Sequence, residues 1–127
     1  MSARQLRHHL DNPGAEVLVA TRGGEILGMA VLFVHARHRA ARLYSLAVSA
    51  HARGAGVGES LLAAAERAAR ARRKTLIRLE VRAENRAAQR LYEQRGYRQF
   101  GARAAFYEDG HDALRYEKTL APVRTAH

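Results

Sequence analysis

The stretch LAVSAHARGAGVGESLL, residues 46–62, combines an apolar segment, a loop with three alternating glycines and the beginning of a helix. The glycines are Gly54, Gly56 and Gly58. This order of elements leaves backbone N–H groups unpaired at a helix N-terminus, where they and the helix dipole favour a bound phosphate. Glycine allows a bulky diphosphate to approach the backbone because it has no side chain.

Three nucleotide-binding loop patterns compete for this stretch. A P-loop requires Gly-Lys-Ser/Thr at its end, whereas Gly58 is followed by Glu59 and Ser60. In the dinucleotide pattern Gly-x-Gly-x-x-Gly, the third glycine would come one residue later. The pattern Gln/Arg-x-x-Gly-x-Gly/Ala is matched completely by Arg53, Gly56 and Gly58. The structural alternative is a glycine-rich turn that only joins a strand to a helix.

A second stretch, residues 79–97, reads LEVRAENRAAQRLYEQRGY. It follows the pattern of a strand ending in Leu-Glu-Val, then Asn-x-x-Ala-x-x-Leu-Tyr-x-x-x-Gly-Phe/Tyr. Together the two stretches resemble the GNAT acetyltransferase superfamily and are most similar to its ribosomal-protein-alanine N-acetyltransferases. The tail FYEDGHDAL, residues 106–114, also resembles that subgroup, so the resemblance covers roughly residues 15 to 120.

The resemblance implies an α/β fold with a mixed, mostly antiparallel twisted sheet, flanking helices and a splayed central parallel pair of strands. It also implies acetyl-coenzyme A as co-substrate, with no metal. Arg53 would add charge near the phosphates, unless it is simply solvated, and Asn85 would contact the pantetheine arm, cap a helix or do both. The residues whose backbone would hold pantetheine are Leu46, Ala47 and Val48, and those whose amides would hold pyrophosphate are Gly54, Ala55, Gly56, Val57, Gly58 and Glu59.

The same resemblance supplies the candidate catalytic residues. Glu80 matches the general base of the alanine acetyltransferases, and it needs to remove only a loosely held proton, directly or through one water, because a free α-amine has a pKa near 8. Tyr92 would hydrogen-bond or protonate the departing thiolate, and a backbone N–H at Val48 would meet the oxyanion. The alternatives are a surface glutamate paired with Arg78 or Arg82, and a tyrosine that only packs in the core.

The composition of the chain excludes several other classes of protein and of mechanism. A length of 127 residues indicates one domain, residues 1–127. There is no apolar run long enough to span a membrane, no signal-peptide pattern and no cysteine, so we expect a cytoplasmic protein without disulfides. The four serines lie in no Gly-x-Ser-x-Gly elbow and the seven histidines form no His-Glu-x-x-His pattern. Direct transfer in a ternary complex is therefore the simplest mechanism, and no metal site is predicted.

The net charge of +10 has two readings. Only two of the 22 basic residues are lysine, which together with the many alanines indicates GC-rich coding and a bacterial chain. The basic cluster at residues 67–74 is either a phosphate-binding surface or the solvated C-terminal end of a helix. Because the chain lacks the interleaved aromatics of single-strand binders, a nucleic-acid partner is not expected.

The remaining elements follow from periodicity and from turn residues. We expect a hairpin turn at Gly23 and Gly24, a helix capped by Asn85 and ended by Gly96, and a mixed sheet. Members of the family usually begin with a strand and a helix before the position of Ala3, so we expect a sheet that lacks both, with an edge that a second copy could cover in a homodimer. The expected helices are 3–10, 58–73 and one after residue 85; the expected strands are 16–21, 26–35, 42–48, 75–81, 97–102 and 113–120.

The sequence says less about the acceptor of the acetyl group than about its donor. The leading hypothesis is a protein or peptide N-terminal α-amine, and the alternatives are a small amine (a polyamine, an amino acid or an antibiotic) or a non-catalytic module that binds acetyl-coenzyme A. The loop at residues 107–112 is expected to face the acceptor. Its acidic residues Glu108, Asp109 and Asp112 either attract a cationic amine or serve as turn formers.

Overall fold

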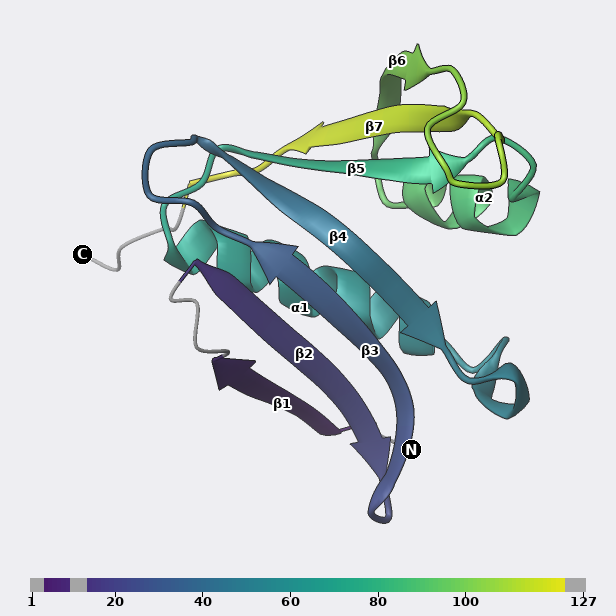
Figure 1. The fold of residues 1–127 in the computed structure, drawn as a ribbon. Coiled ribbons are helices and arrows are strands. Elements are labelled where there is room, and N and C mark those ends of the chain that lie inside the picture. Colours follow the sequence, from purple (N-terminus) through teal and green to yellow (C-terminus); the bar gives the residue numbers. More distant parts are fainter. Residues whose placement is uncertain (1–3, 10–13, 123–127) are drawn as a thin grey trace.

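The computed structural model describes the backbone of residues 4–9 and 14–122, and the side chains of residues 14–122. These residues form one seven-stranded sheet with two α-helices and a short 3-10 turn (Figure 1). In chain order the elements are β1 (Arg4–His9), β2 (Ala15–Arg22), β3 (Glu25–Phe33), β4 (Ala40–Val48), η1 (Ala50–Ala52), α1 (Val57–Ala71), β5 (Leu76–Arg82), α2 (Arg86–Gln94), β6 (Arg98–Arg103) and β7 (Ala113–Thr119).

The strands are ordered β1-β2-β3-β4-β5-β7-β6 across the sheet. All neighbours are antiparallel except β4 and β5, which run parallel. The hairpin between β2 and β3 turns at Gly23 and Gly24, whose φ angles of 56° and 83° lie in the region that glycine adopts without strain. The sheet and its hairpin therefore match the expected mixed, mostly antiparallel fold.

The parallel pair of strands separates halfway along its length. β4 and β5 pair only from Ala40 opposite Leu76 to Leu43 opposite Leu79. Beyond that point β4 pairs with β3 alone and β5 with β7 alone, and Figure 1 shows the two strands diverging. The register between β3 and β4 also shifts at Tyr44, which bends β4 at the start of the separation. The splayed central pair is thus confirmed.

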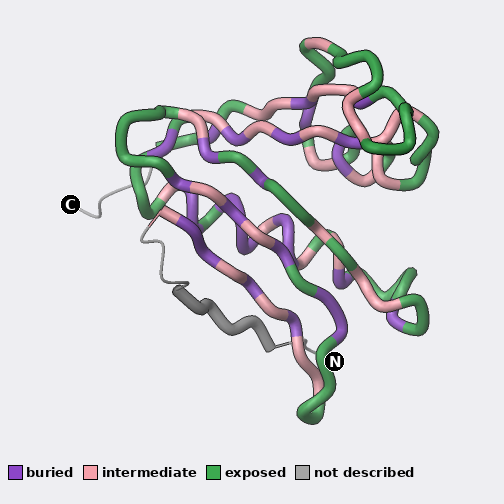
Figure 2. The backbone as a smooth tube through the Cα atoms, in the orientation of Figure 1, coloured by how far each residue is buried: buried purple, intermediate pink, exposed green. Residues whose placement is uncertain are grey.

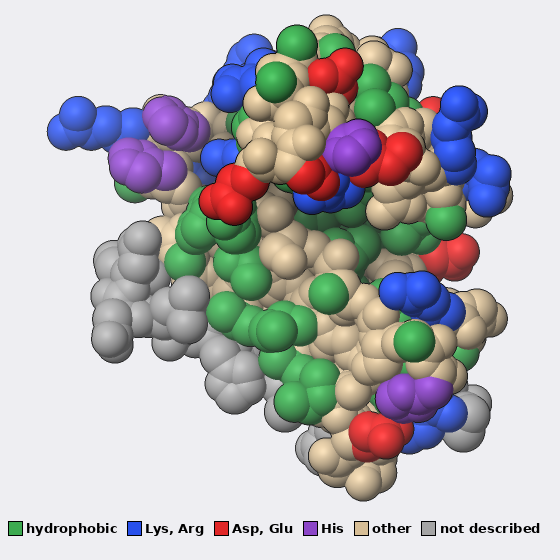
Figure 3. Space-filling view, turned by 45° about the vertical axis from the view of Figure 1, so that its right-hand side comes forward, with side chains coloured by type: hydrophobic (Ala, Val, Ile, Leu, Met, Phe, Trp, Pro, Cys, Tyr) green, Lys and Arg blue, Asp and Glu red, His purple; other side chains and the backbone are tan. Residues whose placement is uncertain are grey.

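The core lies between the sheet and the two helices. α1 lies behind β2, β3 and β4 in Figure 1, and buried positions alternate along these strands in Figure 2. The opposite face of the sheet keeps Met29 and Tyr44 exposed, and apolar side chains form a band across the space-filling view of Figure 3. Residues central to the core include Leu18, Leu32, Leu43, Leu61, Leu62, Ile77, Leu79 and Tyr116.

A buried carboxylate joins the two helices to the far strands. Glu66 of α1 is 2% exposed and accepts hydrogen bonds from Arg95 Nη2 at 2.9 Å, Tyr97 Oη at 2.9 Å and Lys118 Nζ at 3.1 Å. Burial acts to raise the pKa of Glu66, but the Arg95, Lys118 and Tyr97 contacts outweigh it and the pKa is lowered. Glu66 therefore stays charged, and fixes α1 against the segment that follows α2.

Two expectations about the N-terminal part are corrected. The helix predicted over residues 3–10 is wrong, because residues Arg4 to His9 form β1 and pair with β2 from Thr21 to Glu16. The expected absence of a first strand is corrected by the same pairing, which covers the β2 edge that we expected to be open. Among the described residues, no helix precedes β2.

Within the described ranges, neither α-helix is long and apolar enough to cross a membrane.

Candidate active site

The glycine-rich loop connects β4, through η1, to α1. Gly54 and Gly56 have φ angles of 81° and 80°, so a residue with a Cβ would be strained at either position. No heavy atom lies within 4 Å of the place where their Cβ atoms would be, so both positions face open space. The loop needs these glycines for its backbone conformation and leaves room for a ligand beside it.

The N-terminus of α1 has no capping side chain. Its N-cap is Gly56, which makes no side-chain hydrogen bond to the first turn. The first intrahelical contact of the loop is the 3.0 Å hydrogen bond from the Ser60 N–H to the Gly56 carbonyl. The N–H groups of the first turn, at Val57, Gly58 and Glu59, therefore lack the usual cap and form a cradle for an anion.

A groove of about 530 Å³ runs from this cradle toward α2. α1 and the loop form one wall, α2 forms the other, and β4 contributes Leu46 and Val48. Ala47 and Ala55, which we also expected here, do not line it. Four residues that we had not assigned to the site do line it: Ala52, Ala87, Ala88 and Leu91. The predicted residues that line the groove are Leu46, Val48, Arg53, Gly54, Gly56, Val57, Gly58, Glu59, Asn85 and Tyr92.

Both ends of α2 are fixed as the sequence predicted. The Asn85 side-chain oxygen accepts a 3.0 Å hydrogen bond from the Ala88 N–H, which confirms the N-cap. At the other end Gly96 has a φ of 92°, and the N–H groups of Gly96 and Tyr97 donate to the carbonyls of Glu93 and Tyr92. This Schellman motif ends the helix at the predicted glycine, so α2 presents a defined face to the groove.

Tyr92 lies in the core and at the groove at once. It is 7% exposed, and its ring packs against Tyr97 and Tyr116 with centroids 5.7 Å and 6.4 Å away. Burial, with a smaller contribution from Tyr107, raises the pKa of Tyr92 to about 12. Its phenol therefore keeps its proton at neutral pH and can act as a hydrogen-bond donor.

Glu80 of β5 lines a second cavity of about 520 Å³, which shares no lining residue with the groove. Its side chain is only 10% exposed, and each carboxylate oxygen has an arginine partner. Arg42 of β4 donates to Oε1 at 2.9 Å and Arg115 of β7 donates to Oε2 at 3.3 Å. The expected alternative partners of Glu80 are wrong, because Arg78 pairs with Glu117 and Arg82 pairs with other acids.

Tyr107, in the loop between β6 and β7, interacts electrostatically with both candidate catalytic residues, and sequence reasoning did not single it out. Burial raises the pKa of Tyr107, Arg82 acts to lower it, and the nearby Glu80 carboxylate raises it further. Tyr107 in turn contributes, less than burial does, to the raised pKa of Tyr92. The signal in the sequence is an aromatic residue directly before the acidic turn.

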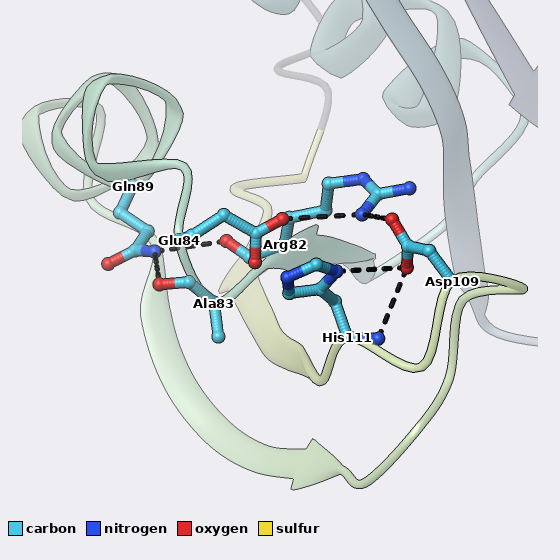
Figure 4. Close-up of polar contacts among 6 residues, drawn as sticks. All are labelled: Arg82, Ala83, Glu84, Gln89, Asp109 and His111. Atoms are coloured by element: carbon cyan, nitrogen blue, oxygen red, sulfur yellow. Dashed lines mark hydrogen bonds and ion pairs between the residues drawn. The ribbon is translucent and has the colours of Figure 1, made fainter.

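The acidic residues of that loop hold it in place. Arg82 donates to Asp109 at 2.7 Å and to Glu84 at 3.2 Å (Figure 4). Its guanidinium lies 4.3 Å from the centroid of the Tyr107 ring. The hydrogen bond from Arg82 is the main reason that the pKa of Asp109 falls to about 2. Asp112 accepts from the Ala105 N–H at 2.9 Å. These contacts favour the structural role of Asp109 and Asp112, and they position Tyr107.

No cluster of three or more potential metal-ligating side chains occurs among residues 14–122. His35 and His38 stack on each other with ring centroids 4.8 Å apart, but they form only a pair.

The chain matches known acetyltransferases along most of its length. Residues 1–120 match the sequence model of the acetyltransferase (GNAT) domain. A Bacillus subtilis (strain 168) protein, provisionally named an alanine N-acetyltransferase of ribosomal protein bS18, is 32% identical over 106 residues, which cover 83% of this chain and 69% of the relative.

Two solved structures show the same relationship in three dimensions. The ribosomal-protein-S18-alanine N-acetyltransferase of Escherichia coli superposes with a TM-score of 0.78 at 27% identity, covering 89% of this chain and 74% of that one. A nourseothricin acetyltransferase superposes with a TM-score of 0.80 at 28% identity, covering 86% and 67%. The two neighbours act on different acceptors by name, so the shared fold does not choose between a protein and a small amine.

Proposed function

Because this chain belongs to the GNAT family and is an N-acetyltransferase, we propose that it transfers acetyl from acetyl-coenzyme A to the N-terminal α-amine of a protein or peptide. The observation that carries the proposal is the uncapped N-terminus of α1, which opens onto a groove that leads to the splayed strands. The similarity to the alanine N-acetyltransferases favours a protein N-terminus as acceptor.

The groove fits the donor in its chemistry. The uncapped amides of Val57, Gly58 and Glu59 offer donors for a pyrophosphate, and the exposed Arg53 adds a positive charge at the same end. The polar groups of β4 that face away from β3 beyond Leu43 have no β5 partner and would bind the amides of the pantetheine arm. Asn85 uses its oxygen as a cap and keeps its NH2 group for the same arm.

In the proposed transfer, the acceptor nitrogen attacks the carbonyl carbon of the thioester and the carbon–sulfur bond breaks. Glu80 takes the proton that the amine loses, directly or through one water, and the Val48 N–H stabilises the oxyanion. Tyr92 donates a hydrogen bond to the departing sulfur. Since the pKa of Tyr92 is about 12 and that of a thiol about 8.5, the phenol stabilises the thiolate by hydrogen bonding rather than by giving up its proton.

The proposal is tested by measuring thiol release from acetyl-coenzyme A with N-terminal peptides and with small amines in parallel. The absence of cysteine removes any thiol background from the protein. We expect release with peptides and a fall of roughly 100-fold in kcat for Glu80→Gln. Glu25→Gln, an exposed carboxylate at the β2–β3 hairpin, is the matched control.

Thiol release with small amines alone would show that the acceptor is a small amine and not a protein N-terminus. No release with either, despite measurable binding of acetyl-coenzyme A, would favour a non-catalytic module. Unchanged turnover in both Glu80→Gln and Tyr92→Phe would contradict the catalytic assignment.

A further inference from the structure

The cavity that holds Glu80 is strongly basic. Glu80 is its only acidic lining residue, and the cavity extends from the segment before β4 across β4 and β5 to β6 and β7. Six of the lining residues are arginines: Arg37, Arg39, Arg42, Arg78, Arg103 and Arg115.

Most of this positive charge is not neutralised. Glu80 forms ion pairs with both Arg42 and Arg115, and Glu117 forms an ion pair with Arg78. The other three arginines, at positions 37, 39 and 103, form no ion pair with any described residue. Six guanidinium groups against two carboxylates leave an excess of four positive charges around this cavity, which disfavours an acceptor with several positive charges and attracts an anionic one.

Two of the arginines are held in fixed positions. Phe100 of β6 packs under the guanidinium groups of Arg78 and Arg115, whose central carbons lie 5.0 Å and 4.7 Å from the ring centroid. Arg115 is therefore fixed between Phe100 and Glu80, and Arg78 between Phe100 and Glu117. Side chains that are already ordered lose little freedom when they bind a carboxylate, and their planar fork matches its geometry.

The position of the unpaired arginines relative to Glu80 sets how far from its reacting amine an acceptor should carry its negative charge. Arg42 touches Glu80, and Arg39 comes three residues earlier along the same chain segment. Three residues span at most about 10 Å, so the backbone at Arg39 lies within about 10 Å of that at Arg42, and both residues line the cavity that holds Glu80. An extended peptide with its amine at Glu80 would reach this charge with its second or third residue.

We infer that the acceptor is a peptide N-terminus followed at its second or third position by aspartate or glutamate, which the arginines of this cavity bind. This inference rests on the proposed function, because it takes Glu80 as the place where the amine reacts. It also excludes polyamines as preferred acceptors, since their charge has the sign of the cavity.

The test compares peptides that share their first residue and carry acidic, neutral or basic residues at positions two and three. We expect kcat/KM for the acidic peptide to exceed that of the neutral one at least tenfold, with the basic peptide slowest. The preference should shrink as salt rises, because the charges face solvent. Equal rates for the three peptides, or a preference for the basic one, would overturn the inference and leave the proposed function intact.

Variants separate the cavity from the general charge of the protein. In Arg39→Gln and Arg103→Gln, the ratio of acidic to neutral kcat/KM should fall several-fold. Arg90→Gln, an exposed arginine of α2 outside this cavity, makes the same change in net charge and should keep the ratio. A ratio that falls equally in all three variants would overturn the inference. Faster acetylation of free glutamate than of the acidic peptide would also overturn the inference. If no acceptor causes thiol release, the proposed function is overturned as well.

Discussion

Replacing Glu66 by glutamine tests the contact that holds the two walls of the groove together. The Glu66 carboxylate accepts three hydrogen bonds, from Arg95, Tyr97 and Lys118, and two of these donors are cations. Glutamine has nearly the same shape, but it carries no charge and turns an NH2 group toward groups that are themselves donors. Breaking a buried ion pair costs about 3–5 kcal/mol. Because Arg95 and Lys118 are 31% and 25% exposed and can regain water, we expect a loss of about 3 kcal/mol.

Thermal and urea denaturation at pH 7 measure this loss. For a domain of this size, about 3 kcal/mol corresponds to a fall of roughly 10 °C in Tm. The control is Glu117→Gln, which removes a carboxylate from a more exposed pair with Arg78 and should cost less than about 1 kcal/mol. A loss below about 1 kcal/mol in Glu66→Gln would refute the reasoning.

The same pair of proteins gives a pH test. Burial acts to raise the pKa of Glu66, but its Arg95, Lys118 and Tyr97 partners lower the pKa below the unfolded value of 4.5. The folded state therefore binds this proton less readily than the unfolded state does. The stabilisation is complete above the unfolded pKa and is lost as pH falls through the lower folded pKa. The stability difference between wild type and Glu66→Gln should shrink with acidification below pH 4.5, and a constant difference would contradict the assignment.

Three further substitutions have expected outcomes. Tyr92→Phe keeps the contacts of the ring with its aromatic neighbours but removes the hydroxyl. In steady-state kinetics, kcat should therefore fall roughly 10- to 100-fold with little change in the KM for acetyl-coenzyme A. An unchanged kcat would remove Tyr92 from the proposed mechanism. Gly28→Ala would place a Cβ 2.8 Å from the Ala47 carbonyl oxygen and 2.9 Å from Leu61 Cδ1. In urea denaturation, it should lower the free energy of unfolding by about 1–3 kcal/mol. The control Gly101→Ala, whose Cβ would meet its nearest atom at 3.8 Å, should lower it less. Asn85→Ala removes the α2 cap and should cost about 1 kcal/mol by the same measurement; no loss would mean that the cap is not needed for α2.

The parts of the fold that the sequence predicted are those fixed by local chemistry. Alternating glycines define the loop, Asn85 and Gly96 define both ends of α2, and two adjacent glycines define a hairpin. β1 was mispredicted because its conformation depends on pairing with β2, a partner that the local pattern of residues 4–9 does not reveal. An edge strand gains its hydrogen bonds from a distant segment, so a short amphipathic stretch can satisfy the pattern of a helix equally well.

The candidate site divides in the same way. The groove residues follow one another along the loop and α2, so their motif brings them together. The environment of Glu80 depends on strand register, because Arg42 and Arg115 are 38 and 35 residues away in the chain. The nearest arginines in the sequence, Arg78 and Arg82, pair elsewhere. Strand order across β4, β5 and β7 decides these partners, and no spacing rule within one strand supplies that order.

The two arginines that bind Glu80 would link the proposed chemistry to the inferred choice of acceptor. A carboxylate has about four lone-pair sites, and Arg42 and Arg115 occupy two of them, so a water or an amine still has access. In the proposed transfer Glu80 takes the proton of the amine, and both guanidinium groups would then lose their counter-charge in a cavity that is already basic. A carboxylate on the acceptor would supply that charge at the moment of transfer, so the acidic peptide should gain in kcat as well as in KM. Measured separately for acidic and neutral peptides, an effect confined to KM would show that the acceptor's charge assists binding alone.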